Sequence, residues 1–148
     1  MVSNYPFKHI FLGGTIDSFH AGHKEYIDLA HALAERVTFS LHSAGFAQSR
    51  QHGKPYEVKP FGERYEAIVD YLDAQGWLER CEIWECQSEA DVEKFISDER
   101  FDAMLVLKED LEIRLRINEE RKKKYAIVIK PRTVDASGED VSSTKLRS

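Results

Sequence analysis

The sequence predicts an α/β fold built on a doubly wound, parallel sheet of five strands. Short apolar runs alternate along the chain with segments of helical periodicity. Strands separated by helices pair in parallel through right-handed crossovers, which places helices on both faces of the sheet. Of the 148 residues, 42% are hydrophobic, which is enough for one core, so residues 1–148 are treated as a single domain.

The apolar runs define the expected strands, and the segments between them define the expected helices. The predicted strands are 9–14, 37–42, 81–86, 101–107 and 125–131. The predicted helices are 22–36, 60–75, 90–100 and 109–124. The stretch 44–59 is the one long connection, and loops of that length are usually functional or mobile.

Two helices are supported by their apolar stripes. In the first, the apolar positions at helical spacing are Tyr26, Leu29, Ala30, Leu33 and Val37. In the second, which Pro60 opens and Gly76 stops, they are Tyr65, Ile68, Val69 and Leu72.

The overall charge excludes some classes of partner. A net charge of −5 and a pI of about 5.7 argue against broad, charge-driven binding to nucleic acid or to an anionic membrane. Neither a signal peptide nor an apolar run of 18 residues is found, so the cytoplasm is the expected compartment. A polyanionic ligand is therefore expected to be small and held locally, and the oligomeric state is not predicted.

The stretch "GGTIDSFHAGHK", residues 13–24, marks the corner between the first strand and the first helix. Gly13 and Gly14 allow the main chain to approach a bound phosphate, although a tight turn also needs such residues. His20 and His23 lie at i and i+3 around the start of the helix, where unpaired amides attract anions. The corner therefore predicts a nucleotide phosphate site.

Two other interpretations of the histidines stay open at this point. A metal site is one, although no third ligand lies nearby and the HExxH arrangement is missing. The other is a pair of core histidines, buried by Phe19 and the face of the helix.

Motifs at both ends of the chain resemble those of one superfamily. "GGTIDSFHAGH" resembles the GGTFDxxHxGH signature of the nucleotidyltransferases, and "VSSTKLRS" at 141–148 resembles their ISSTxxR signature. "KPYEVKPFGERYEAIVDYL" is similar to the K-x-Y-x-V-x-P-Y-x-x-R segment of the archaeal and eukaryotic type of phosphopantetheine adenylyltransferase. "FDAMLVLKEDLEIRLRINEERKKK" resembles the later strand, loop and helix of that family, so the likeness spans nearly the whole chain.

The resemblance implies a Rossmann-like nucleotidyltransferase fold and a reaction. AMP would be transferred from ATP to 4′-phosphopantetheine, giving dephospho-coenzyme A and pyrophosphate, a step of coenzyme A biosynthesis. The catalytic residues that it implies are Thr15, His20 and Lys54. The nucleotide-binding residues that it implies are Gly13, Gly14, His23, Arg64, Ser142, Ser143, Thr144 and Arg147.

Several of these positions have alternatives. Lys59 can replace Lys54 if the loop register shifts, and Arg64 can pair with Glu63 or Glu66 instead of phosphate. Mg²⁺ is expected because ATP normally travels with it, and it keeps most of its waters, so few protein ligands are needed and none is named. Asp17 is close enough to be a candidate, but it can equally hold the loop through main-chain hydrogen bonds.

The sequence also departs from the family pattern. Ile16 replaces the usual Phe, a change that conserves volume. "LHSAGF" at 41–46 and "VLKEDLE" at 106–112 lack expected acidic positions, and "CQSEADVEKF" lacks the family's Asp-Pro loop. Two rival functions therefore remain: another small nucleotidyltransferase, using CTP or a different phosphorylated acceptor, and a nucleotide-binding relative without turnover.

Overall fold

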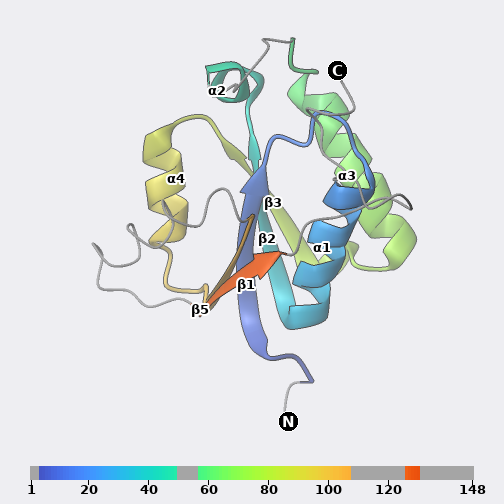
Figure 1. Cartoon of the computed structure of the whole chain (residues 1–148), viewed down its shortest axis with the longest axis vertical. Coiled ribbons are helices and arrows are strands. Elements are labelled where there is room, and N and C mark those ends of the chain that lie inside the picture. The colour runs from blue at the N-terminus through green and yellow to red at the C-terminus, as the bar shows by residue number, and fades with distance from the viewer. Residues whose placement is uncertain (1–3, 50–56, 108–125, 131–148) are drawn as a thin grey trace.

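The computed structural model describes residues 4–49, 57–107 and 126–130. Its strands form one parallel sheet in the order β3-β2-β1-β4-β5 (Figure 1). The strands are β1 (Phe7–Gly14), β2 (Ala34–His42), β3 (Cys81–Cys86), β4 (Ala103–Leu107) and β5 (Ala126–Lys130). The predicted α/β class with a parallel sheet is confirmed.

Helices cover both faces of the sheet. They are α1 (Ala21–Leu33), α2 (Ala44–Ser49), α3 (Phe61–Gln75) and α4 (Glu89–Ile96), and a 3₁₀ turn, η1, spans Leu78–Arg80. Helices α1 and α3 lie on one side of the sheet and α4 lies on the other (Figure 1). Within the described ranges, no helix is both long and apolar enough to span a bilayer. The predicted helix 109–124 lies outside the described residues.

The core is divided into two clusters because successive strand residues point to opposite faces. Ile10 and Leu12 of β1 pack with α1 and α3, whereas Phe11 between them packs with α4. On β4, Leu105 belongs to the same cluster as Ile10 and Leu12, and Met104 belongs to the same cluster as Phe11. Strands buried on both faces read as continuous apolar runs, which is the pattern that located them in the sequence.

Helix α1 ends earlier than predicted, and β2 begins earlier. The helix stops at Leu33 instead of residue 36, so Val37 is a buried strand residue and not part of the helical stripe. Arg80 of η1 donates to the carbonyls of His31 and Ala34 at 2.6 and 2.7 Å, and to that of Glu35 at 3.0 Å. The carbonyls at the helix end thus accept from a side chain about 45 positions away, and the sequence around the helix end contains no sign of it.

Helix α3 follows the prediction with one exception. Gly76 adopts the left-handed conformation, φ 77°, that ends the helix, and the Trp77 amide donates to the Leu72 carbonyl at 2.9 Å. Ile68 and Leu72 are fully buried, but the expected core residue Tyr65 is 40% exposed. Helix α2 lies in the predicted connection 44–59, and Ser43 Oγ caps it by accepting from the Phe46 amide at 3.1 Å.

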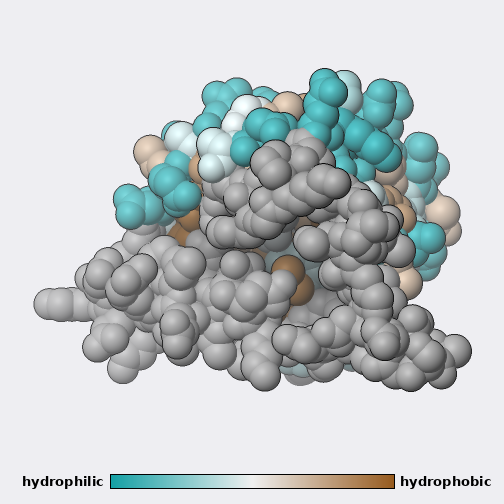
Figure 2. All heavy atoms as spheres, turned by 45° about the horizontal axis from the view of Figure 1, so that its top comes forward, coloured by the Kyte–Doolittle hydropathy of each residue, from teal (hydrophilic) through white to brown (hydrophobic). Residues whose placement is uncertain are grey.

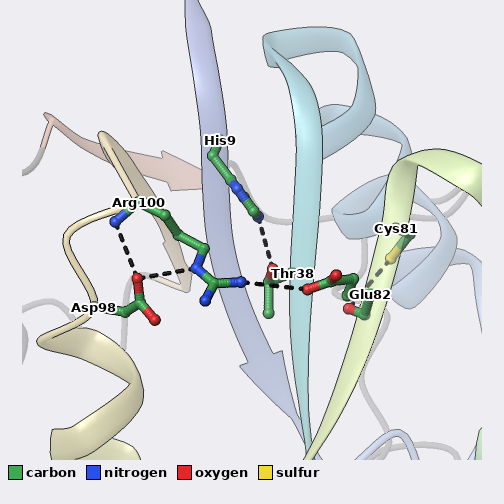
Figure 3. A network of polar contacts seen from close by, with 6 residues as sticks. All are labelled: His9, Thr38, Cys81, Glu82, Asp98 and Arg100. Atoms are coloured by element: carbon green, nitrogen blue, oxygen red, sulfur yellow. Dashed lines mark hydrogen bonds and ion pairs between the residues drawn. The ribbon is translucent and has the colours of Figure 1, made fainter.

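Polar contacts tie the amino end of the sheet (Figure 3). His9 Nε2 lies 2.7 Å from Thr38 Oγ1, which joins β1 to β2. The Arg100 guanidinium contacts Glu82 of β3 at 3.6 Å and Asp98 at 3.0 Å. Along the strands, these contacts lie on the amino side of the corner that follows β1.

Candidate active site

The sheet has a topological switch point between β1 and β4. β1 pairs with β2 as far as Gly14 and Leu41, but among the described residues its pairing with β4 stops at Phe11 and Met104. The two strands therefore separate toward their carboxyl ends, and a cavity lies between them, lined by residues 11–13, 104–106 and Tyr26. Open α/β sheets bind ligands just beyond such a point.

Tyr26 joins the strands where their ladder ends. Its hydroxyl lies 3.1 Å from the Gly13 carbonyl, 3.2 Å from the Leu105 carbonyl and 3.4 Å from the Gly13 amide. The residue is buried, as its place on the apolar stripe predicts. The hydroxyl adds a role that periodicity does not reveal, because it fixes the strand end from which the corner starts.

The two motif histidines begin α1 and cap it. His20 is the N-cap residue, and its Nδ1 accepts from the amides of Gly22 at 2.9 Å and His23 at 3.4 Å. His23 Nδ1 accepts in return from the His20 amide at 3.3 Å, which completes a capping box. Both residues are half-buried, so the interpretation as core histidines is wrong.

These caps determine where each ring carries its proton. A nitrogen that accepts an amide hydrogen is unprotonated, so the neutral rings of His20 and His23 carry their protons on Nε2. The ring centroids are 3.7 Å apart and nearly parallel, with an interplanar angle of 19°. With both Nδ1 atoms accepting amide hydrogens, the N–H donor of each neutral ring is Nε2. Such donors suit phosphate oxygens.

The structure requires a glycine at position 13 but not at position 14. A Cβ on Gly13 would lie 3.0 Å from the Ser40 carbonyl oxygen and 3.2 Å from Ser40 Cβ, so the close approach of β2 requires this glycine. A Cβ on Gly14 would meet Ile16 and Phe39 atoms at 3.9 Å, which is ordinary contact. The fold therefore does not require Gly14, which leaves the predicted approach of a phosphate as a reason for it.

Arg64 is 1% exposed and holds the site together from inside. Its Nη1 donates to the carbonyls of Thr15 at 2.9 Å and His42 at 2.7 Å, and its Nε donates to that of Lys59 at 2.8 Å. A planar guanidinium suits such a task because its donors are fixed in direction. The predicted contact of Arg64 with phosphate stays a prediction.

The corner contains one residue in an unfavourable conformation. Ile16 has a φ of 52°, in the left-handed region that β-branched residues avoid, and its side chain is buried in the core. Asp17 follows it, and its Oδ1 accepts from the Lys59 amide at 2.9 Å. Asp17 therefore holds the segment before α3, which is the second of the two roles considered for it.

His42 is a site residue that the sequence analysis missed. Its Nδ1 lies 3.1 Å from Thr15 Oγ1, and it ends β2 next to the corner. The signal was its position, because the carboxyl ends of neighbouring parallel strands meet at one edge of the sheet. Figure 2 brings this end of the molecule forward and shows mainly hydrophilic side chains on its described part.

The profile of the cytidylyltransferase-like family matches residues 11–148, which include the corner, the switch point and the chain's last motif. The chain belongs to the cytidylyltransferase-like family.

Similar proteins cover almost the whole chain. A Methanopyrus kandleri protein named phosphopantetheine adenylyltransferase is 32% identical over 95% of this chain and 89% of its own length. A Pyrobaculum aerophilum protein of the same name is 28% identical, covering 97% and 92%. The crystal structure of an Archaeoglobus fulgidus protein with unknown function has a TM-score of 0.69 and 26% identity, covering 90% of this chain and 99% of that one.

Part of the site expected from the sequence lies outside the described residues. These positions are Lys54, Ser142, Ser143, Thr144 and Arg147. The structure does bring together Gly13, Gly14, Thr15, His20 and His23 at the end of β1 and the start of α1. In the described ranges, no group of three His, Cys, Asp or Glu side chains is arranged to hold a metal ion.

Proposed function

We propose that this chain is a phosphopantetheine adenylyltransferase, which transfers AMP from ATP to 4′-phosphopantetheine and forms dephospho-coenzyme A and pyrophosphate. The observation that carries the proposal is the pair of capping histidines, whose Nε2–H donors stand at the start of α1 beyond the switch point. The family and the names of its near full-length relatives support this choice of reaction.

The chemistry needs donors at the phosphates and no protein nucleophile. An oxygen of the acceptor phosphate attacks the α-phosphorus, the new P–O bond forms, and the bond to the β-phosphate oxygen breaks to release pyrophosphate. Negative charge is thereby redistributed over the α-phosphoryl oxygens and the leaving group. His20, Thr15 and the amides of the corner donate to these oxygens, and His23 contacts the nucleotide phosphates.

The remaining predicted residues complete this model. Lys54 bridges the acceptor phosphate and ATP as a point charge, and Ser142, Ser143, Thr144 and Arg147 hold the β- and γ-phosphates. Mg²⁺ enters as part of the substrate, bound to ATP oxygens and water. Asp17 is not assigned to it, because its Oδ1 accepts from the Lys59 amide.

A pyrophosphate-release assay tests the reaction. ATP and CTP are each combined with 4′-phosphopantetheine, glycerol 3-phosphate and FMN, with Mg²⁺ present. Release is expected with ATP and 4′-phosphopantetheine. Release with a different pair would indicate another nucleotidyltransferase, and no release with any pair would favour a nucleotide-binding protein without turnover.

Two substitutions of His20 separate its capping from its proposed catalytic role. Asn is a strong N-cap residue whose Oδ1 can accept the same amides, but it has no Nε2–H. We expect His20→Asn to keep the stability of the protein while kcat falls about 10²- to 10³-fold, the usual loss for one transition-state donor. His20→Ala loses the cap as well and should also cost about 1 kcal/mol of stability.

Binding measurements complete this test. ATP affinity, measured by calorimetry, should stay within a few fold in His20→Asn, because the lost donor acts mainly on charge that develops during transfer. Equal losses of affinity and rate would contradict the proposed role of His20.

A further inference from the structure

His42 and Thr15 stand side by side at the carboxyl edge of the sheet. The β1–β2 register ends with Gly14 opposite Leu41, so the next residues of the two segments are Thr15 and His42. His42 Nδ1 lies 3.1 Å from Thr15 Oγ1, and both residues are half-buried. The contact therefore joins a residue of the proposed catalytic group to one outside the motifs.

The fold fixes the geometry of this pair on both sides. One buried nitrogen, Nη1 of Arg64, donates to the carbonyls of both Thr15 and His42, which holds the two backbones together. The His42 ring also packs edge-on against Phe46 of α2, with centroids 5.0 Å apart and an interplanar angle of 76°. The ring is thus held in place while its Nδ1 faces the Thr15 hydroxyl.

We propose that His42 is a positioning residue that donates from Nδ1 to Thr15 and so directs the Thr15 hydroxyl hydrogen at a substrate phosphate. This inference rests on the proposed function. A threonine hydroxyl has a single hydrogen, and ionised phosphate oxygens only accept. If Thr15 gave its hydrogen to His42, its lone pairs would face the phosphate and repel it. Phosphate binding therefore requires the proton on Nδ1 of His42.

The proton position makes His42 different from the motif histidines. His20 and His23 accept main-chain hydrogens at Nδ1, and so carry their protons on Nε2. His42 is expected to have a protonated Nδ1 in the phosphate complex. The site thus contains imidazoles with opposite donor directions, which a spectroscopic measurement distinguishes.

Nitrogen-15 NMR of histidine-labelled full-length protein tests this directly. The probes are saturating ATP, 4′-phosphopantetheine and inorganic pyrophosphate, and His42→Asn assigns the signal. A protonated Nδ1 on His42 in at least one complex, with unprotonated Nδ1 on His20, is expected. An unprotonated His42 Nδ1 in every complex overturns the inference. This readout needs no turnover, so it stands apart from the proposed reaction.

A double-mutant cycle tests the same link in catalysis. His42→Ala should lower kcat/KM for 4′-phosphopantetheine roughly tenfold, the scale of one hydrogen bond to a charged group. In a Thr15→Val background, which has no hydroxyl to direct, His42→Ala should cause no further loss. His42→Asn, whose amide can donate to Thr15, should recover most of the rate. Losses that multiply in the double variant would mean that His42 acts structurally, and would overturn the inference.

A pair farther toward the amino side of the same two strands offers a matched control. His9 Nε2 and Thr38 Oγ1 lie 2.7 Å apart and form the same type of pair between β1 and β2 (Figure 3). His9→Ala should leave kcat/KM within about twofold, because this pair is far from the carboxyl edge. A loss as large as that of His42→Ala would show that any strand-joining histidine has this effect, which contradicts the positioning role. Absence of turnover in the wild-type protein would refute the proposed function, and the NMR result would still decide the inference.

Discussion

Separate substitutions of Gly13 and Gly14 distinguish a glycine that folding requires from one that ligand binding requires. Both occupy the end of β1, and neither has a positive φ among the described backbone angles. In Gly14→Ala the new methyl group meets Ile16 and Phe39 at 3.9 Å, so the folded protein accommodates it. The free energy of unfolding should therefore stay the same or rise by up to about 1 kcal/mol, because alanine restricts the unfolded chain.

Ligand binding should respond in the opposite way. A methyl group at position 14 would keep phosphate away from the corner amides, and a hydrogen bond to a charged group contributes about 1.5–3 kcal/mol. The Kd for ATP should thus rise about tenfold to a hundredfold, measured by isothermal titration calorimetry. An unchanged affinity for ATP in a normally folded Gly14→Ala protein would refute the predicted approach of phosphate to this glycine.

Gly13→Ala is the matched comparison. Its Cβ would lie 3.0 Å from the Ser40 carbonyl oxygen, and a main-chain atom cannot move without disturbing the β1–β2 ladder. Overpacking of this kind typically costs about 1–3 kcal/mol, which urea denaturation measures. A Gly13→Ala protein as stable as the wild type would show that the strands adjust, and the structural explanation of this glycine would be wrong.

Three predictions concern stability. Burial lowers the pKa of His31 to about 4, so on acidification the unfolded chain takes up the proton before the folded protein does. The free energy of unfolding, measured by urea denaturation, should therefore fall by about 3 kcal/mol between pH 6.5 and 4. His31→Phe, which can still stack on Trp77, should show a weaker dependence of this free energy on pH. Ile16→Leu removes a β-branched residue from φ 52° and should raise the free energy of unfolding by about 0.5–1 kcal/mol; a loss would mean that core packing outweighs strain. In Arg80→Lys, the lysine cannot donate to all three carbonyls at the end of α1 at once. The melting temperature should fall by an amount that corresponds to a loss of about 1–2 kcal/mol of stability. An unchanged melting temperature would mean that other contacts hold the end of α1.

Local patterns predicted most elements, and the clearest error was at the end of α1 and the start of β2. The apolar runs located β1 and β4, because strands buried on both faces need continuous apolar sequence. The predicted end of α1 was wrong because the carbonyls at its observed end accept hydrogen bonds from Arg80, which lies in a distant turn. His31 was missed although it lies one helical turn after buried Ile27, since a histidine does not count as apolar in such a pattern.

The site residues that belong to a motif could be predicted, whereas the contacts that arise from packing could not. The pair His20 and His23 came from spacing and resemblance, and the structure places both at the start of α1. The contacts of Arg64 with main-chain carbonyls and of His42 with Thr15 join segments that are far apart in the sequence. Such contacts depend on the β1–β2 register and on the packing of α3, which no single window of sequence contains.

The hydrogen bonds that the histidines make to the fold favour a phosphate over a metal ion as the ligand of this pair. A ring nitrogen binds a metal ion through its lone pair, and the Nδ1 lone pairs of His20 and His23 accept main-chain amide hydrogens. To ligate a metal through Nε2, each ring would have to move its proton to Nδ1, which would break both caps of α1. That loss would cost about 1 kcal/mol or more per cap before any metal bound. The same caps leave the proton of each neutral ring on Nε2, and an N–H group is what a phosphate oxygen accepts from.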